Sequence, residues 1–463
     1  MISKFIRYFL YLLSILGIIC FYLSYFGLET QKFNDLIKNQ ILEKNKDINI
    51  ELKSIKILLN LKKISFNLKT EKPKVIFNNK VIKLEEISTN FSLNSFFNKN
   101  YLIDELKIST EELKLKNILS ILRAYKDSPQ LFIFEKMIQG GSIKADINLN
   151  FKPNGKINKD YEIQGFVKNT KIKLLNKKLI DNANFNFKIK KNEYILNSLN
   201  LEYSRLKLLS KIIKIKNKND YFLVSGDIKN IKSDIKPELF FLLKDNLFKD
   251  INNLNLSSEN LFSFKFNKKF KIKDFNLKSN IELNSLDYNL AQPKLKLFLP
   301  NFNNLIQFDN NKITLDYNND KLSIVGKGNF SIDDESEIIE YELQKFHNDY
   351  NFKANINIKK NPIFFDFLNY KKEKNVDSMI KLDAFINNNN PISFKKILYE
   401  ENNNKLLFNN LILNKDYQIN SIKLINLDIK NNNKIKNKII IKKKSNNYQL
   451  NGTYKFYTTS IPW

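Results

Sequence analysis

The residues that could carry out catalysis or bind a metal ion are few in this chain of 463 residues. The single histidine, His347, stands among polar neighbours, as a surface residue does. With no second histidine and no usable cysteine, the ordinary zinc sites are excluded. Gly326-Lys327-Gly328 is a bare G-x-G between strand-like stretches, without the helix whose N-terminus holds a phosphate in such motifs. We therefore expect no cofactor and no metal site.

Adjacent acidic residues could act as general acid and base if their carboxylates met at one substrate. Such residues occur at Glu85-Glu86, Glu111-Glu112 and Asp333-Asp334-Glu335. Neighbouring residues of a strand point to opposite faces, so these groups do not converge on one atom. The run from Asp333 to Glu337 could bind a cation loosely, but a solvated loop is the better interpretation. Because the sequence also has no G-x-S-x-G and no P-loop motif, we predict that the chain is not an enzyme.

Alternation of apolar and polar residues dominates the chain after its first thirty residues, most clearly from Ile143 to Phe151. A period of two places all apolar side chains on one face of a β-strand. Similar stretches recur almost to the C-terminus, and a chain of one-sided strands must cover a long apolar face. The residues that we predict to form this face are Ile143, Ala145, Ile147, Leu149, Phe151, Phe185, Phe187, Ile189, Phe262, Phe264, Phe266, Ile281, Leu283, Phe352, Ile356 and Ile358.

The composition supports an ordered β protein with unusual turns. Hydrophobic residues make up 43% of the chain, which argues against wholesale disorder. With only 10 glycines and 9 prolines, we expect Asn, Asp and Lys to form the turns, as in the Asn-rich links 387–391 and 401–405. The net charge of +29 comes from lysines spread along the whole chain, so we predict no nucleic-acid binding. The charge should still favour anionic lipid surfaces.

The N-terminus predicts a membrane anchor. Residues 8–28 contain no charged side chain and are long enough, as a helix, to cross a hydrocarbon core of about 30 Å. Lys4 and Arg7 precede this run, so residues 1–7 should stay in the cytoplasm and the body should lie across the membrane. A signal peptide is the alternative, but the run is long and no A-x-A-like cleavage site follows it. Cys20 is interpreted as a membrane-facing residue.

Helices are few in the remainder of the chain. We predict an amphipathic linker helix over 29–45, in which Thr30 serves as the cap and Ile37 and Ile41 share one face. Further helical interruptions are expected near 117–139, 236–250 and 362–370 within a body that spans 46–463. The helices interrupt the strands and do not alternate with them, so a βαβ architecture is not expected. The predicted fold class is mainly β and antiparallel.

The order of these elements resembles the AsmA-like proteins of Gram-negative envelopes, the AsmA, TamB and YhdP group. One passage that carries the likeness is the entry, from 33–37 through 61–68, with the strand after Pro73 and the stretch 87–93. The second passage is 140–151 with 161–169, which is similar to the central region of the YhdP-type members. The resemblance extends over most of the chain as a pattern of apolar alternation.

Membership of this family would imply an elongated, taco-like antiparallel β-groove with an apolar concave side. It would place the chain in the inner membrane as a single-pass protein, with a cytoplasmic N-terminus and a periplasmic body. The implied role is transport of phospholipid between the inner and outer membranes, or support of outer-membrane biogenesis. The implied partners are phospholipid acyl chains, the inner membrane and an outer-membrane or other envelope protein.

Three hypotheses follow from these patterns. In an open groove, the apolar residues named above would bind acyl chains at about 0.8 kcal/mol per CH₂ without catalytic groups. The second hypothesis is a periplasmic assembly factor that holds strands of outer-membrane proteins at its sheet edges. The third is a structural scaffold of β-sandwich domains, in which the apolar faces bury one another.

Overall fold

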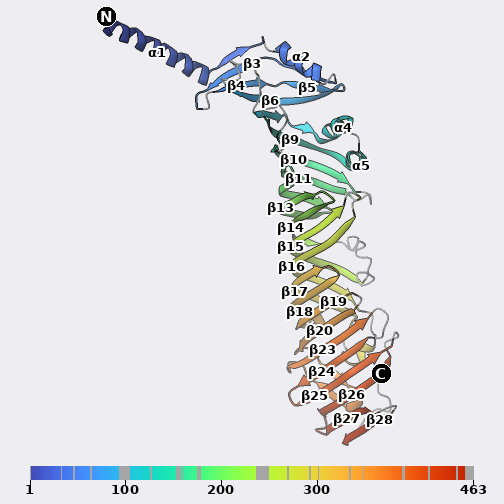
Figure 1. The fold of residues 1–463 in the computed structure, drawn as a ribbon. Helices are drawn as coiled ribbons and strands as arrows, with labels where there is room; N and C mark the ends of the chain where they lie inside the picture. The colour runs from blue at the N-terminus through green and yellow to red at the C-terminus, as the bar shows by residue number, and fades with distance from the viewer. Residues whose placement is uncertain are drawn as a thin grey trace. The chain divides into compact units, whose positions relative to one another are not determined.

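The computed structural model is mainly β, with about 70% of its residues in strands, few helices and an apolar N-terminal helix (Figure 1). The chain divides into two compact units. Unit 1 comprises residues 1–205 and 209–224, and unit 2 comprises 206–208 and 225–463. A single continuous body over 46–463 therefore stays a prediction, and the two units are described one by one.

The structure describes residues 2–32, 34–44, 47–62, 65–92, 105–125, 128–152, 158, 160–174, 179–235, 250–267, 269, 271–290, 293–300, 302–332, 335–347, 349–387, 392–414, 418–444 and 447–453. Some predicted features lie outside these residues: nearly all of the helix near 236–250, the acidic residues Asp333-Asp334 and most of the Asn-rich link 387–391.

The elements of unit 1, together with β14 at its boundary, are α1 (Ile2–Tyr25), β1 (Leu28–Thr30), α2 (Asn34–Lys44), β2 (Ile48–Glu51), β3 (Ile55–Asn60), β4 (Ser65–Glu71), β5 (Lys74–Phe77), β6 (Lys80–Ser92), β7 (Glu105–Thr110), β8 (Leu113–Lys114), α4 (Leu115–Tyr125), α5 (Pro129–Met137), β9 (Ile138–Asn150), β10 (Glu162–Lys173), β11 (Leu179–Lys190), β12 (Glu193–Tyr203), β13 (Leu206–Lys218) and β14 (Tyr221–Asp234). All strand pairs described within this unit are antiparallel.

The elements of unit 2 are β15 (Ile251–Asn267), β16 (Ile272–Asn289), η3 (Pro293–Leu297), β17 (Leu305–Asn318), β18 (Lys321–Ile332), β19 (Glu335–Phe346), β20 (Asp349–Ile358), β21 (Ile363–Phe365), η4 (Asp366–Leu368), β22 (Tyr370–Lys372), β23 (Ser378–Asn387), β24 (Ser393–Glu401), β25 (Asn404–Leu413), β26 (Ile419–Lys430), β27 (Lys436–Lys444) and β28 (Asn447–Thr453). Strands β15 to β20 and β23 to β28 form one antiparallel meander, with β20 paired to β23.

The apolar N-terminal helix begins and ends earlier than predicted. Helix α1 has an apolar stretch from Lys4 to Tyr25 that is long enough to cross a membrane. The amides of Phe26 and Gly27 both donate to the carbonyl of Tyr22, which ends the helix. The predicted limit at residue 28 was wrong because Leu28 already pairs with β3 as the first residue of β1.

The linker and the second helical region are partly as predicted. Helix α2 begins at Asn34, since Thr30 belongs to β1 and does not cap the helix. Helices α4 and α5 fall in the predicted region 117–139, and the hydroxyl of Ser128 accepts a hydrogen bond from the amide of Leu131 to cap α5. Gly140 and Gly141, which follow this helix, lie inside β9, where a Cβ on Gly141 would lie 2.5 Å from the Thr170 Oγ1 atom.

The predicted helix near 362–370 is instead a short β-hairpin. β21 pairs with β22, and only the 3₁₀ turn η4 between them is helical. Apolar runs of this length do not distinguish strand from helix, and here burial decided the outcome. Leu368 is fully buried and Phe365 is 8% exposed.

Asparagine forms many of the backbone irregularities. Among the described residues, twelve of the twenty non-glycine residues with positive φ are asparagines. Asn tolerates this conformation better than most residues. Asn402, with a φ of 49°, turns β24 into β25 and confirms the predicted Asn-rich turn at 401–405.

Bulges inside the strands break the alternation. In β10, Val167 lies opposite Phe185 of β11, whereas Thr170 lies opposite Ala183. Three residues of β10 therefore advance against two of β11, with Asn169 at a φ of 50° in the bulge. Val167 and Thr170 are both buried, although a strict period of two would place them on opposite faces.

Candidate functional site

The predicted apolar residues of unit 1 lie in rows across the sheet. Ile147 of β9 lies opposite Ile108 of β7 and Ile163 of β10, and Ile163 lies opposite Ile189 of β11. Two parallel rows are Ala145–Gly165–Phe187 and Ile143–Val167–Phe185, and Leu149 lies opposite Leu106. All the predicted residues of this unit, Phe151 included, are partly buried, and Phe187 is 8% exposed. They share rows across the sheet, as expected.

In unit 2 the predicted residues also lie in register. The rings of Phe262, Phe264 and Phe266 follow one another along β15 at centroid distances of 6.0 and 6.3 Å. Further cross-strand pairs are Ile281 with Ile313, Leu283 with Leu256, Phe352 with Leu343 and Ala384, and Ile356 with Ile339 and Ile380. Of the sixteen predicted residues, Ile358 alone lines the large pocket described next.

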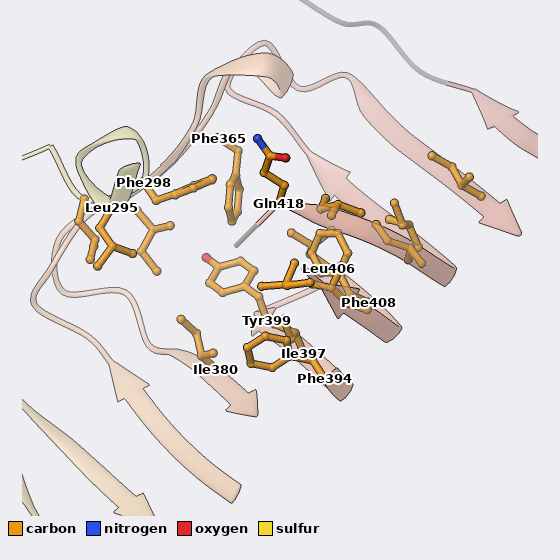
Figure 2. A pocket seen from close by; sticks show the side chains of 18 of the residues that line it. Leu295, Phe298, Phe365, Ile380, Phe394, Ile397, Tyr399, Leu406, Phe408 and Gln418 are labelled. Carbon is orange, nitrogen blue, oxygen red and sulfur yellow. The ribbon is translucent and has the colours of Figure 1, made fainter. Parts of the chain in front are cut away.

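A cavity of about 1380 Å³ lies in the last third of unit 2 (Figure 2). One wall is the apolar face of strands β23 to β28. Its residues include a row in direct register, Ile397–Phe408–Ile425–Ile441–Leu450. Among the described residues that line the cavity none is charged, and only Tyr399, Gln418 and Tyr448 bring polar side-chain atoms.

The opposite wall comes from two connections that cross the sheet, and we call them the cover. The first connection is 293–300 with Phe302, and the second is 360–374. The amide of Phe364 donates to the carbonyl of Phe298 at 3.0 Å, which ties the two connections together. Leu295, Phe298 and Phe365 of the cover point into the cavity of Figure 2. The cavity is thus bounded by the sheet on one side and by the cover on the other.

Two clusters of buried apolar residues fix the cover to the sheet. Leu368 packs in a cluster with Tyr399, Leu427 and Ile429 of the sheet. Phe302, which is 1% exposed, packs with Phe330 and Ile332 of β18. The apolar face of the sheet is therefore packed core where Leu368 and Phe302 of the cover contact it, and it lines the cavity elsewhere.

Hydrogen bonds of a buried carboxylate also hold the cover. Glu337 of β19 is 4% exposed and accepts hydrogen bonds from the amides of Lys359, Lys360 and Asn361, at 2.7 to 2.9 Å. The fully buried amine of Lys372 donates to the carbonyls of Lys359 and Asn361. Burial lowers the pKa of this amine, and the charge of Glu337 opposes that effect. These buried charges fix the second connection of the cover where it leaves β20.

A pair of buried phenols lies at the cavity wall, which includes Tyr399. Tyr370 of the cover and Tyr399 of β24 have their hydroxyl oxygens 2.8 Å apart, and Tyr370 donates to the carboxylate of Glu401. Asn404 also donates to Glu401, at 2.9 Å. Burial raises the pKa of both phenols above the ordinary value, and the hydrogen bond to Glu401 adds to this for Tyr370.

This pair predicts a loss of stability at high pH. In the unfolded chain the phenols ionise near pH 10, whereas in the folded chain they keep their protons. Unfolding therefore releases protons above about pH 10, so the free energy of unfolding falls as the pH rises. We expect the double variant Tyr370→Phe, Tyr399→Phe to lose less stability than the native chain between about pH 9 and 11. Chemical denaturation measures this, with Tyr448→Phe as control; equal slopes for native chain and double variant would contradict the assignment.

The glycines of the G-x-G motif have a structural role. A Cβ on Gly326 would lie 2.2 Å from the Tyr341 ring, and one on Gly328 would lie 2.3 Å from the side chain of Asn311. Asn311 is buried and donates to the carbonyls of Asp309 and Asn329. Only glycine lets these side chains lie against β18. The motif therefore serves close packing of neighbouring strands.

The other residues singled out for chemistry are dispersed. His347 is exposed in the turn after β19. Glu85 pairs with Lys144 at 2.6 Å, whereas Glu86 pairs with Lys69 at 2.7 Å, so these neighbours face different partners as expected. Among the described residues, no group of three His, Cys, Asp or Glu side chains could hold a metal ion.

Sequence reasoning missed most of the pocket wall. Phe394 and Ile397 are three residues apart, yet both line the cavity, because the register of β23 and β24 shifts between Asp383 and Ala384. In β25, Phe408 and Leu411 flank Asn410 in the same way. The alternation is visible on either side of these points, so a search that allowed one extra residue, Lys395 in β24 and Asn410 in β25, would have found the strands.

The fold and the site define a mainly β protein with an apolar N-terminal helix and a large apolar cavity in its second unit. Comparison with known proteins adds no further assignment: no family model, no curated protein and no solved structure matches the chain.

Proposed function

We propose that this chain is a membrane-anchored lipid carrier whose cavity in unit 2 binds the acyl chains of phospholipid. The proposed setting is that of the AsmA-like proteins, with α1 in the inner membrane, residues 1–7 in the cytoplasm and the body in the periplasm. The role would be phospholipid transport between the inner and outer membranes. The chain would do this without catalytic residues.

The observation that carries this proposal is the apolar cavity. A methylene group takes about as much space as a water molecule, roughly 30 Å³, so a cavity of this size has room for both chains of a phospholipid. Each buried methylene contributes about 0.8 kcal/mol. Since the described residues of the lining carry no charge, they would not bind an ionic head group, which would remain in water.

The helix α1 supports the membrane setting. Its length and composition fit a single span, and Lys4 and Arg7 lie before the most apolar part. Within unit 2, the rows of apolar residues in β15–β20 would extend the path along which chains move, and the rows of β9–β11 would bind chains in unit 1. We also propose that these rows form an open groove.

The experiment is to purify the full chain in a detergent that is not a phospholipid, wash it until bulk lipid is removed, and identify the phospholipid that stays bound by mass spectrometry. The test variant is Ile425→Asp with Ile441→Asp, which places two carboxylates in the cavity wall. We expect about tenfold less bound phospholipid, because an acyl chain cannot solvate a charge.

The matched control is Leu424→Asp with Ile440→Asp. These residues are the immediate neighbours on the same strands, they lie opposite Lys442 and Asn426, and they are similarly half-buried. The control should retain its lipid. Absence of phospholipid from the native chain, or an equal loss in both variants with folding intact, would refute the proposal.

A further inference from the structure

The last hairpin of unit 2 is basic on one face and apolar on the other. From residue 429 to 453 the sequence contains seven lysines and no Asp or Glu, against 77 basic and 48 acidic residues in the whole chain. This local excess is far stronger than the general one. Five of the seven lysines lie on β27, which pairs with β28, the last described strand.

Except for Lys443, which follows Ile441 on the apolar face, the register of the hairpin separates the two kinds of side chain. Ile439, Ile441 and Leu450 lie on the face that continues the cavity wall. Lys438 and Lys442 alternate with them and are exposed on the other face. The hairpin is therefore an amphipathic two-stranded ribbon.

These lysines have few carboxylates near them. Asp428 of β26 forms an ion pair with Lys436 at 3.3 Å, in which the lysine side chain is 67% exposed and the aspartate side chain 30% exposed. Asp428 also lies opposite Lys438 in the register. No ion pair is described for Lys438 or Lys442. The positive charge of this face is thus available to an anionic partner.

The cavity reaches the same hairpin. Tyr448 is 51% exposed and Leu450 is 42% exposed, and both line the cavity at its edge. Lys443 lies opposite Tyr448 in the register. Lysine, tyrosine and leucine side by side suit a membrane interface, where the amine meets phosphate and the rings lie at the head-group level.

We propose that the β27–β28 hairpin docks on the surface of a bilayer that contains anionic lipid. The lysines would bind the phosphates, and Tyr448 and Leu450 would bring the cavity edge against the acyl region. An anionic bilayer fits better than an acidic protein or nucleic acid because the charge borders an apolar cavity. This docking goes beyond the proposed lipid binding and can be measured separately from it.

The test uses the full chain in phosphatidylcholine nanodiscs and two kinds of acceptor vesicle. One kind is pure phosphatidylcholine, and the other has one part in three of phosphatidylglycerol. Flotation in a density gradient measures the bound fraction. We expect binding to the anionic vesicles only, and loss of this binding at about 0.5 M salt, where charges are screened within a few ångström.

The test variant is Lys436→Glu, Lys438→Glu, Lys442→Glu, which should reduce vesicle binding roughly tenfold or more. The control is Lys171→Glu, Lys214→Glu, Lys218→Glu, three exposed lysines of strands in unit 1 with the same change in net charge. It should bind nearly as the native chain does. Phospholipid that stays bound to the detergent-purified variants should be unchanged in both.

Three outcomes would overturn the docking proposal. If the control variant loses as much vesicle binding as the test variant, binding depends on net charge and not on the hairpin. If the native chain binds neutral and anionic vesicles equally, the lysines do not direct the binding. Failure to bind anionic vesicles together with retention on polyglutamate or DNA would assign the face to an acidic macromolecule. Each of these three flotation results is compatible with phospholipid bound in the cavity, so the lipid-binding proposal is tested separately.

Discussion

Replacing Leu368 with alanine is expected to lower the free energy of unfolding of unit 2 by about 3 to 5 kcal/mol. Leu368 has no exposed surface and packs in the cluster that joins the cover to β24, β26 and β27. Its truncation removes the transfer free energy of the side chain and leaves a space that the surrounding strands cannot close. Among single apolar truncations in this protein we expect this to be one of the largest effects.

The matched control for this substitution is Leu297→Ala. Leu297 belongs to the other connection of the cover and is 46% exposed, so its truncation should cost about 1 kcal/mol or less. Urea unfolding, with hydrogen exchange of β23–β27 as the local readout, measures both variants. A cost for Leu368→Ala no larger than that for Leu297→Ala would show that the cover does not depend on this cluster.

The second large effect is expected from Glu337→Ala. The substitution leaves the amides of Lys359, Lys360 and Asn361 without their acceptor, and each unpaired buried donor costs about 1 to 3 kcal/mol. It also removes the negative charge that stabilises the protonated form of the buried Lys372 amine. Since water can replace part of these bonds, we expect a total loss of about 3 to 5 kcal/mol.

The control for Glu337 is Glu340→Ala on the same strand. Glu340 pairs with Lys327 at 2.6 Å, but both side chains are about half exposed or more, and such a pair contributes about 0 to 1 kcal/mol. Hydrogen exchange at residues 359–361 should rise in the Glu337 variant and not in the control. Similar stabilities of the two variants would mean that the hydrogen bonds of Glu337 do not hold the cover.

Both predictions concern the same part of the molecule because the cover turns an apolar sheet face into a cavity. Without it, the side chains of β24 to β27 would form an exposed face. With it, part of this face becomes core and part becomes the space of about 1380 Å³. Loss of the cover should therefore reduce stability and lipid binding together, whereas the paired aspartates in the wall should reduce lipid binding more than stability.

The strands and the N-terminal helix could be read from the sequence because they depend on local patterns. Alternation over Ile143 to Phe151 is sufficient to predict β9, and the uncharged run after Arg7 is sufficient to predict α1. The use of Asn in turns also followed from the scarcity of glycine and proline, and Asn402 confirms it. These features each depend on a few neighbouring residues and not on the remainder of the fold.

The sequence by itself determined that the chain would form strands with one apolar side behind an apolar helix. The tertiary structure decided which residues share a row, because single extra residues such as Asn169 and Asn410 reverse the alternation. It also decided that Phe302, Leu368 and Glu337 hold a cover across the sheet. Their partners lie far away in the chain, and burial against such partners, which no local pattern records, selected the hairpin at 363–372 and created the cavity.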